Sequence, residues 1–260
     1  MWGWLSGGMI CRVTSPYAQD GFGVGFDWGP IGAEVVAGDI VAVVDVLSFT
    51  TAVTVAADLG IDVYPYRWRD ETAVAYAEQN SATLAVGRSA AGPADVSLSP
   101  VSIRRVTGIT KLVLPSPNGS TIAKQLSDTG ATVIAVSLRN RTAAAEWVTK
   151  QLTERPTAKV VAIAAGERWK DGSLRPAVED LWGAGGFLSA LQRDDLSPEA
   201  RAAEAAYEAV ADELPRMLHE CAGGHELTQY GFPEDVAIAA EVDESRSVPV
   251  LRDGRLFRST

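Results

Sequence analysis

The sequence predicts an α/β fold in which helices cover both faces of a central sheet, mostly parallel or mixed. Strand-like and helix-like segments alternate along the chain, as they do in α/β proteins. The strand-like runs are rich in Val and Ala and lack polar alternation, which indicates a sheet buried on both faces. The segment around Thr51 recurs around Thr121, which indicates that two similar halves build the sheet.

Length and composition fit a single domain. With 260 residues and 47% hydrophobic composition, the chain can bury a sizeable core, and we expect one α/β domain over 1–260. The internal repeat covers 39–95 and 109–172. The remaining segment, 173–260, is expected to complete the domain with helices and a hairpin.

Six strands are expected within the repeats, from the runs DIVAVVDV, IDVYPY, ATLAVG, KLVLP, ATVIAV and KVVAIAAG. Each repeat continues as strand, hydroxyl-rich turn, helix, glycine, strand, Arg-containing turn and helix. Gly60 and Gly130 follow the first helix of each copy, where a left-handed C-cap favours glycine. Two unrelated α/β units could look alike by chance in an Ala- and Val-rich chain. The shared register across turns and caps favours duplication, with the matched pairs Thr51–Thr121, Asp58–Asp128, Arg69–Arg139 and Thr72–Thr142.

The C-terminal segment predicts two helices and a hairpin. A helix is expected over 175–191, and another over 197–223 with Ser197 as N-cap and a proline at its first position. The run SVPVLRDGRLF, 247–257, predicts a hairpin with Asp-Gly at its turn.

The bulk composition excludes several classes of partner. A net charge of −10 argues against binding nucleic acid or an anionic membrane. No window reaches the roughly 18 apolar residues that a membrane span needs, and the N-terminus lacks the basic region of a signal peptide. Two unpaired cysteines, Cys11 and Cys221, favour a reducing cytoplasm. We therefore expect a cytoplasmic protein that begins at Met1 or Met9, with its assembly left open between monomer and homodimer.

The sequence also lacks the motifs of several familiar enzymes. It has no Walker or dinucleotide-binding glycine motif and no nucleophile elbow. Its two histidines, His219 and His225, argue against a Ser-His-Asp triad and a His-rich zinc site. Carboxylates near hydroxyls remain, and oxygen ligands of this kind suit Mg²⁺.

Two hydroxyl-rich loops correspond in the repeats, DVLSFTT in the first and PSPNGST in the second. Both follow a strand and lead into a helix N-terminus, whose free N–H groups and dipole favour an anion. Because ligands of α/β sheets bind at the carboxyl ends of strands, both loops are expected to open on one site. The alternative is that Ser and Thr cap these helices without any ligand.

These residues carry a resemblance. VVDVLSFTTAV, SPNGST, AAGE, VEDLWGAG and GFPEDVAIAAEVD with VPVL follow the order and spacing of the 2-phosphosulfolactate phosphatase family of coenzyme M biosynthesis. The resemblance runs from residue 39 to the end. It implies a Mg²⁺-dependent phosphatase that hydrolyses the phosphate monoester of a small sulfonated or carboxylated hydroxy acid. The chain departs from the family pattern in its ligand loops, at Ser48 and Phe49 for Arg-Ala, and also at 86–88, 97–100 and 116–120.

The leading hypothesis, a Mg²⁺-dependent phosphatase, assigns a role to each candidate residue. Asp45, Glu179 and Asp180 are expected to hold Mg²⁺, and Glu167 to activate water, although Glu167 could instead cap a helix. Phosphate oxygens are expected to meet side chains and backbone N–H groups of the two loops, at Asn118, Ser120, Thr121, Thr50 and Thr51. Arg88, with Arg139, is expected to balance the second charge of the acid.

Two alternative functions stay open. DVLSFT resembles the signature of aspartyl-phosphate phosphatases, which would make Asp45 a nucleophile, although Leu47 stands where that signature has a second acid. The other alternative is a non-catalytic paralogue that binds a small anion, which the missing family arginine at Ser48 favours.

Overall fold

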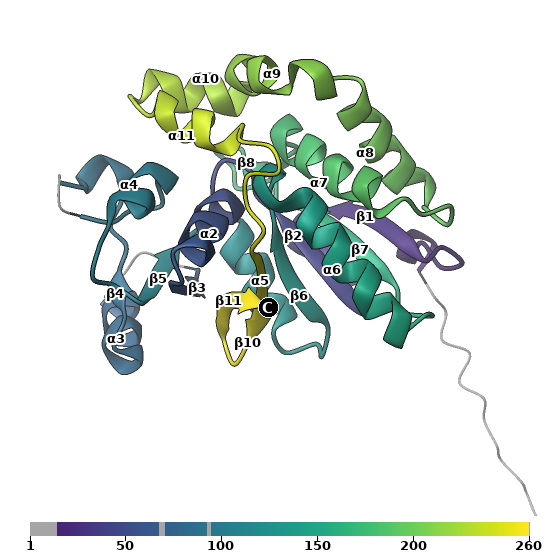
Figure 1. The fold of residues 1–260 in the computed structure, drawn as a ribbon, viewed down its shortest axis with the longest axis horizontal. Helices are drawn as coiled ribbons and strands as arrows, with labels where there is room; N and C mark the ends of the chain where they lie inside the picture. Colours follow the sequence, from purple (N-terminus) through teal and green to yellow (C-terminus); the bar gives the residue numbers. More distant parts are fainter. Residues whose placement is uncertain (1–14, 68–70, 93–94, 260) are drawn as a thin grey trace, which may run out of the picture.

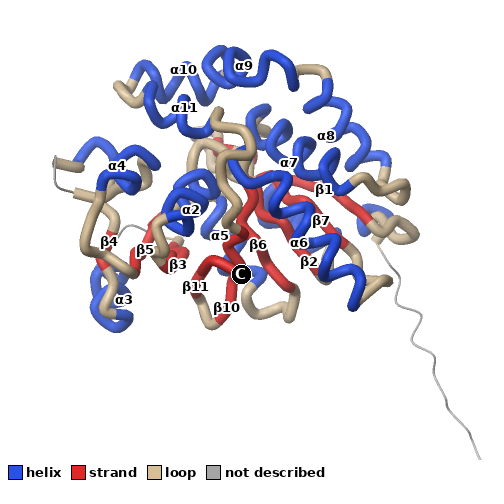
Figure 2. Tube along the Cα trace, in the orientation of Figure 1, coloured by secondary structure: helices blue, strands red, loops and turns tan. Residues whose placement is uncertain are grey.

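The computed structural model describes residues 15–67, 71–92 and 95–259. A nine-stranded sheet runs through the centre, with helices on both faces (Figures 1 and 2). This confirms the predicted α/β class. Four residues named above lie outside the described residues: the candidate start residues Met1 and Met9, and also Cys11 and Arg69.

The sheet contains two parallel blocks. The first block has the order β1 (Val24–Trp28), β7 (Val160–Ala164), β2 (Ile40–Val44) and β6 (Thr132–Val136). The second has the order β3 (Asp62–Tyr66), β5 (Lys111–Pro115) and β4 (Thr83–Leu84).

A C-terminal hairpin joins the two blocks. Its strands β10 (Val248–Arg252) and β11 (Arg255–Ser259) pair antiparallel with each other, with β6 and with β3. Three antiparallel steps in succession make the two blocks run in opposite directions. The turn residues Asp253 and Gly254 have φ of 50° and 75°, which confirms the predicted Asp-Gly hairpin. Its central place, with the chain end in the middle of the molecule (Figure 1), was not predicted.

The strand order places corresponding strands of the two repeats symmetrically about this hairpin. The first repeat contains β2, α2 (Phe49–Asp58), β3, α3 (Glu71–Asn80) and β4, and the second β5, α5 (Gly119–Leu126), β6, α6 (Arg141–Glu154) and β7. Read toward the hairpin, the order is β7-β2-β6 on one side and β4-β5-β3 on the other. The strands at the same place in these two orders are the corresponding strands of the two repeats. Each repeat begins in one block and crosses to the other. That duplication produced this order, and that the two units superpose, stay predictions.

Strand β2 is buried on both of its faces. Val41 and Val43 share a cluster with residues of α1 (Gly29–Val36) and α5, whereas Ile40, Ala42 and Val44 pack with α6 and α7 (Val178–Leu191). Successive side chains of a strand point to opposite faces, so helices cover both sides here. Any polar group at the end of β2 therefore needs a partner.

The expected helix over 197–223 is broken. It consists of α8 (Pro198–Glu208), a 3-10 turn (Ala211–Glu213) and α9 (Leu214–Glu220), and it ends inside α10 (Ala222–Gln229). Pro215 explains the break before α9, because a proline inside a helix removes a backbone donor and clashes with the preceding turn.

Helix α11 (Pro233–Ala239) follows and lies beside α9 and α10 (Figure 1). The remaining α-helix is α4 (Pro100–Arg105), and β8 (Glu167–Arg168) and β9 (Leu174–Arg175) form a separate short hairpin. None of the helices in the described ranges is long and apolar enough to cross a membrane.

Candidate active site

Asp45 follows β2 directly and joins the two hydroxyl-rich loops. Its side chain is 5% exposed. Oδ1 accepts a hydrogen bond from the Phe49 N–H at 3.1 Å, and Oδ2 accepts one from the Gly119 N–H at 2.8 Å. One carboxylate thus caps the N-termini of both α2 and α5, where the helix dipoles favour negative charge. The two loops meet, as their positions in the repeats predicted.

Only glycine fits at position 119. A Cβ atom there would lie 2.6 Å from Phe49 Cδ1 and 2.7 Å from Asp45 Oδ2. Contacts below 3.0 Å with a buried ring and a buried carboxylate would force the two helices apart. The Asn118-Gly119 pair is therefore explained by the close approach of α5 to Asp45.

The hydroxyls of these loops support the backbone. Thr50 donates to the Asp45 carbonyl at 2.8 Å, Thr51 to the Val46 carbonyl at 2.8 Å and Thr121 to the Pro117 carbonyl at 2.7 Å. Ser120 donates to the carbonyls of Tyr66 and Ser116. All four residues are buried. Each hydroxyl proton is thus engaged by a backbone carbonyl, and binding of phosphate by these residues stays a prediction.

Glu179 and Asp180, in the first turn of α7, lie close to the loop that follows Asp45. Asp180 Oδ1 accepts from the Val46 N–H at 2.7 Å, and Oδ2 accepts from the Gly166 N–H at 2.8 Å. Asp180 thereby ties α7 to the loops that follow β2 and β7. Glu179 Oε2 lies 3.5 Å from the Cys221 thiol, which donates to it.

Burial raises the pKa of Asp45, Glu179 and Asp180, and the charges of Asp45 and Glu179 raise that of Asp180 further. Carboxylates in this state are stabilised by protons or by a cation. In the described part of the chain, no three His, Cys, Asp or Glu side chains converge in an arrangement that could hold a metal, so the predicted triad is not assembled as a ligand set. The residues still fit Mg²⁺ in charge and ligand type, because Mg²⁺ takes one or two carboxylates and keeps several waters.

Glu167 stands at the base of the β8–β9 hairpin. Its Oε2 accepts a hydrogen bond from Asn118 Nδ2 at 3.0 Å. Burial, followed by the charge of Asp45, raises the pKa of Glu167 to about 7. Near neutral pH this carboxylate can therefore both accept and release a proton.

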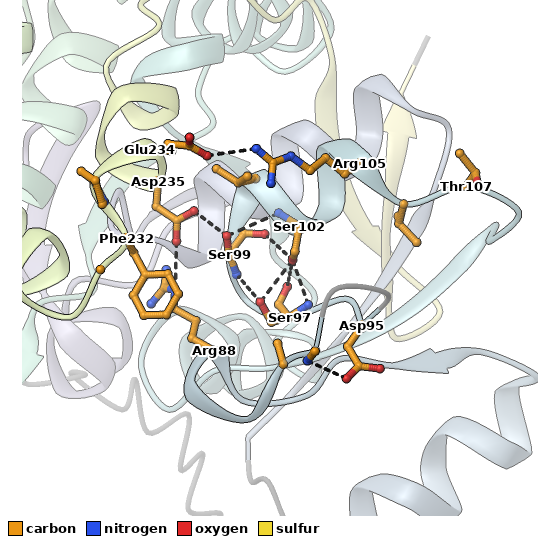
Figure 3. A pocket seen from close by; sticks show the side chains of 16 residues that line it. Arg88, Asp95, Ser97, Ser99, Ser102, Arg105, Thr107, Phe232, Glu234 and Asp235 are labelled. Atoms are coloured by element: carbon orange, nitrogen blue, oxygen red, sulfur yellow. Dashed lines mark hydrogen bonds and ion pairs between the residues drawn. The ribbon is translucent and has the colours of Figure 1, made fainter.

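A cavity of about 490 Å³ opens beside these acids. Its lining includes Glu167, Glu179, Arg88, Glu226 and Phe232. A second cavity, of about 640 Å³, has Arg88 and Phe232 in its lining as well (Figure 3). Arg88 therefore lines both cavities, the 490 Å³ cavity beside the acids and the 640 Å³ cavity, whose lining includes three serines.

The structure does not bring Arg139 into this cluster. Its guanidinium pairs with Asp58 at 3.0 Å and with Glu241, and its side chain is buried. Asp58 is the last residue of α2, whereas Asp45 caps the first turn. At a rise of 1.5 Å per residue, the length of α2 separates Asp58 from this first turn by roughly 13 Å. Arg139 is a structural ion-pair residue in this fold.

Asp235 and Phe232, which both contact Arg88, were not singled out from the sequence. Phe232-Pro233-Glu234-Asp235 has a proline and two acids at the start of a helix, a pattern that helix capping already explains. Only the fold shows that the second of these acids turns inward.

The raised pKa of Glu167 predicts that stability depends on pH. Because the folded-state pKa of about 7 exceeds the ordinary value of 4.5, the folded protein binds more protons between these values. The free energy of unfolding should therefore fall as pH rises through this window, by up to about 3 kcal/mol from this group. Urea titrations in EDTA at pH 5 and pH 8 measure the fall. Glu167→Gln should show a smaller fall, and an equal fall in both proteins would contradict the assignment.

Comparison with known proteins gives a consistent result. A family model described as 2-phosphosulpholactate phosphatase matches residues 31–254. A Thermus thermophilus protein named "Probable 2-phosphosulfolactate phosphatase" is 30% identical over 223 residues, which cover 82% of this chain and 88% of that protein. Two proteins of the same name, from Thermotoga petrophila and Thermotoga maritima, are 28% and 27% identical over 218 residues, with the same coverage.

Proposed function

Because the chain belongs to the 2-phosphosulpholactate phosphatase family, we propose that it hydrolyses the phosphate monoester of a small sulfonated or carboxylated hydroxy acid, with 2-phosphosulfolactate as the first candidate. The observation that carries the proposal is the acidic cavity, where Glu167 and Glu179 share a wall with Arg88. Carboxylates for a metal and a base, next to a cation for an acid group, are what such a substrate requires.

Glu179 is the candidate for direct contact with Mg²⁺, because it lines the cavity whereas Asp45 and Asp180 do not. Asp45 is the second candidate, and Asp180 adds negative charge while it holds the Val46 and Gly166 backbone. When bound, the ion would neutralise the phosphate oxygens in a site whose own net charge is negative.

Glu167 is the candidate general base. It would take a proton from water, the water oxygen would bond to phosphorus, and the bond from phosphorus to the ester oxygen would break. The hydroxy acid leaves with that electron pair and takes up a proton. Asn118 would hold Glu167 in place through the 3.0 Å hydrogen bond, and Arg88 would bind the acid group of the substrate.

Phosphate release from 2-phosphosulfolactate tests the proposal. We expect turnover with Mg²⁺, and a loss of about 10²-fold or more in EDTA, because a catalytic metal supplies several kcal/mol of charge stabilisation. The Asp45→Ala, Asp180→Ala double variant sets the background rate, with Glu167→Gln as a second blank. Turnover of no small phosphate monoester above that background would reject an enzymatic function and leave binding of a small anion.

A trapping experiment separates attack by water from attack by a protein nucleophile. Both Asp45 oxygens already accept backbone hydrogen bonds, and Asp45 lines neither cavity. This favours attack by water. A fluoroberyllate adduct on Asp45 after incubation with substrate analogue would instead support the aspartyl-phosphate mechanism.

A further inference from the structure

Asp235 lies in the first turn of α11 and is 1% exposed. Its Oδ2 accepts a hydrogen bond from Arg88 Nε at 3.1 Å, and its Oδ1 accepts one from the Ser99 hydroxyl (Figure 3). A carboxylate this deeply buried is costly unless both oxygens are paired, and here both are. Asp235 is therefore fixed on one side by Ser99 and faces Arg88 with the other.

Arg88 is held from three directions. Asp235 engages Nε, the Ser48 hydroxyl accepts from Nη2, and the Phe232 ring centre lies 5.9 Å from Cζ. In the described part of the chain these are the hydrogen bonds that the guanidinium makes, so most of its five N–H donors stay available. The side chain is 18% exposed and lines both cavities, so a ligand can reach those donors.

Other acids compete for the same cation. The charges of Asp45 and Glu167 act on Arg88, after the larger effect of Asp235. Without Asp235, the guanidinium would be drawn toward these carboxylates, which the proposed reaction needs free for a metal and a proton. The contact with Asp235 on the far side holds the Arg88 donors between the cavities.

We propose that Asp235 is a positioning residue that holds Arg88 for the second acid group of the substrate, and so sets the preference for phosphate monoesters that carry a sulfonate or carboxylate. This inference rests on the proposed function. It assigns the specificity of the site to α11, a helix outside both repeats.

Three secondary phosphate monoesters test it, and they differ in the acid groups that they carry besides the phosphate. Isopropyl phosphate carries none, 2-phospholactate carries a carboxylate, and 2-phosphosulfolactate carries a carboxylate and a sulfonate. In Asp235→Asn, we expect the ratio of kcat/KM for an acid-bearing ester to that for isopropyl phosphate to fall by about tenfold to a hundredfold, mainly through KM. This is the usual size for one charge-assisted hydrogen bond. Asp235→Glu, which keeps the charge, should recover part of the ratio.

Glu234→Gln is the matched control. Glu234 precedes Asp235 in the same helical turn, but it pairs with Arg105 at 3.1 Å, and both of these side chains are exposed. The control should keep the wild-type ratio. If Asp235→Asn fails to fold, Ser48→Ala removes the other hydrogen bond to Arg88 and should lower the same ratio. An unchanged ratio, or equal losses on all three esters, would overturn the inference.

Binding of sulfolactate, the dephosphorylated acid, separates this inference from the proposed function. Calorimetry should show a Kd about tenfold or more higher in Asp235→Asn than in the wild type and in Glu234→Gln. If the wild type hydrolyses no ester but this difference appears, the proposed function fails and the role of Asp235 stands. If the wild type is an active phosphatase and Asp235→Asn binds sulfolactate normally, the role of Asp235 is rejected.

Discussion

Glu167→Gln is expected to lower kcat for the preferred ester by about 10²- to 10⁴-fold, the contribution of a positioned general base. Gln keeps the size of the side chain and can still accept the hydrogen bond from Asn118 Nδ2, but it cannot take a proton. Because the substitution removes a group that is costly to ionise, the variant should be at least as stable as the wild type at pH 8. KM should change little.

The pH profile supplies the control for this prediction. In the wild type, kcat/KM should rise with pH up to the pKa of Glu167, which burial and the charge of Asp45 raise to about 7 in the metal-free protein and which bound Mg²⁺ would lower. Asn118→Ala removes the hydrogen bond that lowers this pKa, so it should move the rise to higher pH and lower kcat less than Glu167→Gln does. A Glu167→Gln protein that keeps full kcat, or a wild-type profile without this rise, would exclude Glu167 as the base.

Local patterns were sufficient for much of the fold. The Val-rich run before Asp45 is a fully buried strand, and the Asp253-Gly254 turn closes a hairpin. Both follow from interactions between neighbours in the sequence, either through side-chain period or through allowed φ values. The central position of that hairpin depends on which distant strands pair, and the local pattern at 247–257 carries no information about those partners.

In the candidate site too, some residues could be predicted from the local sequence and others depend on contacts with distant residues. Asp45 could be predicted because a carboxylate at the end of a buried strand requires a partner. Arg88 and Arg139 are both arginines that follow strands, yet one lines two cavities while the other pairs with Asp58. The difference comes from residues far away in the chain, such as Asp235 for Arg88. Loop hydroxyls were also ambiguous, because a serine that caps a turn and one that binds phosphate have the same sequence context.

Asp45→Asn is expected to lower the free energy of unfolding by about 1–3 kcal/mol, the usual loss when a buried charged hydrogen bond is weakened. Asn has one acceptor oxygen for two backbone donors, so its amide group would face the N–H of either Phe49 or Gly119. Relief of repulsion with Asp180 and Glu179 offsets part of this loss. Chemical denaturation in EDTA measures the net effect.

The response of Asp45→Asn to Mg²⁺ tests whether Asp45 binds the ion in addition to capping α2 and α5. If its charge helps to hold the ion, the rise in Tm on addition of Mg²⁺ should be lost along with activity, because a ligand stabilises only the folded state that binds it. Asp58→Asn is the control: it removes a carboxylate from the other end of α2, where Asp58 pairs with Arg139, and should keep the Mg²⁺ response although it too lowers stability. If Asp45→Asn melts early but responds to Mg²⁺ as the wild type does, Asp45 is a cap for two helices and not a metal ligand. Its place at the end of β2 would then be explained by the meeting of α2 and α5 alone.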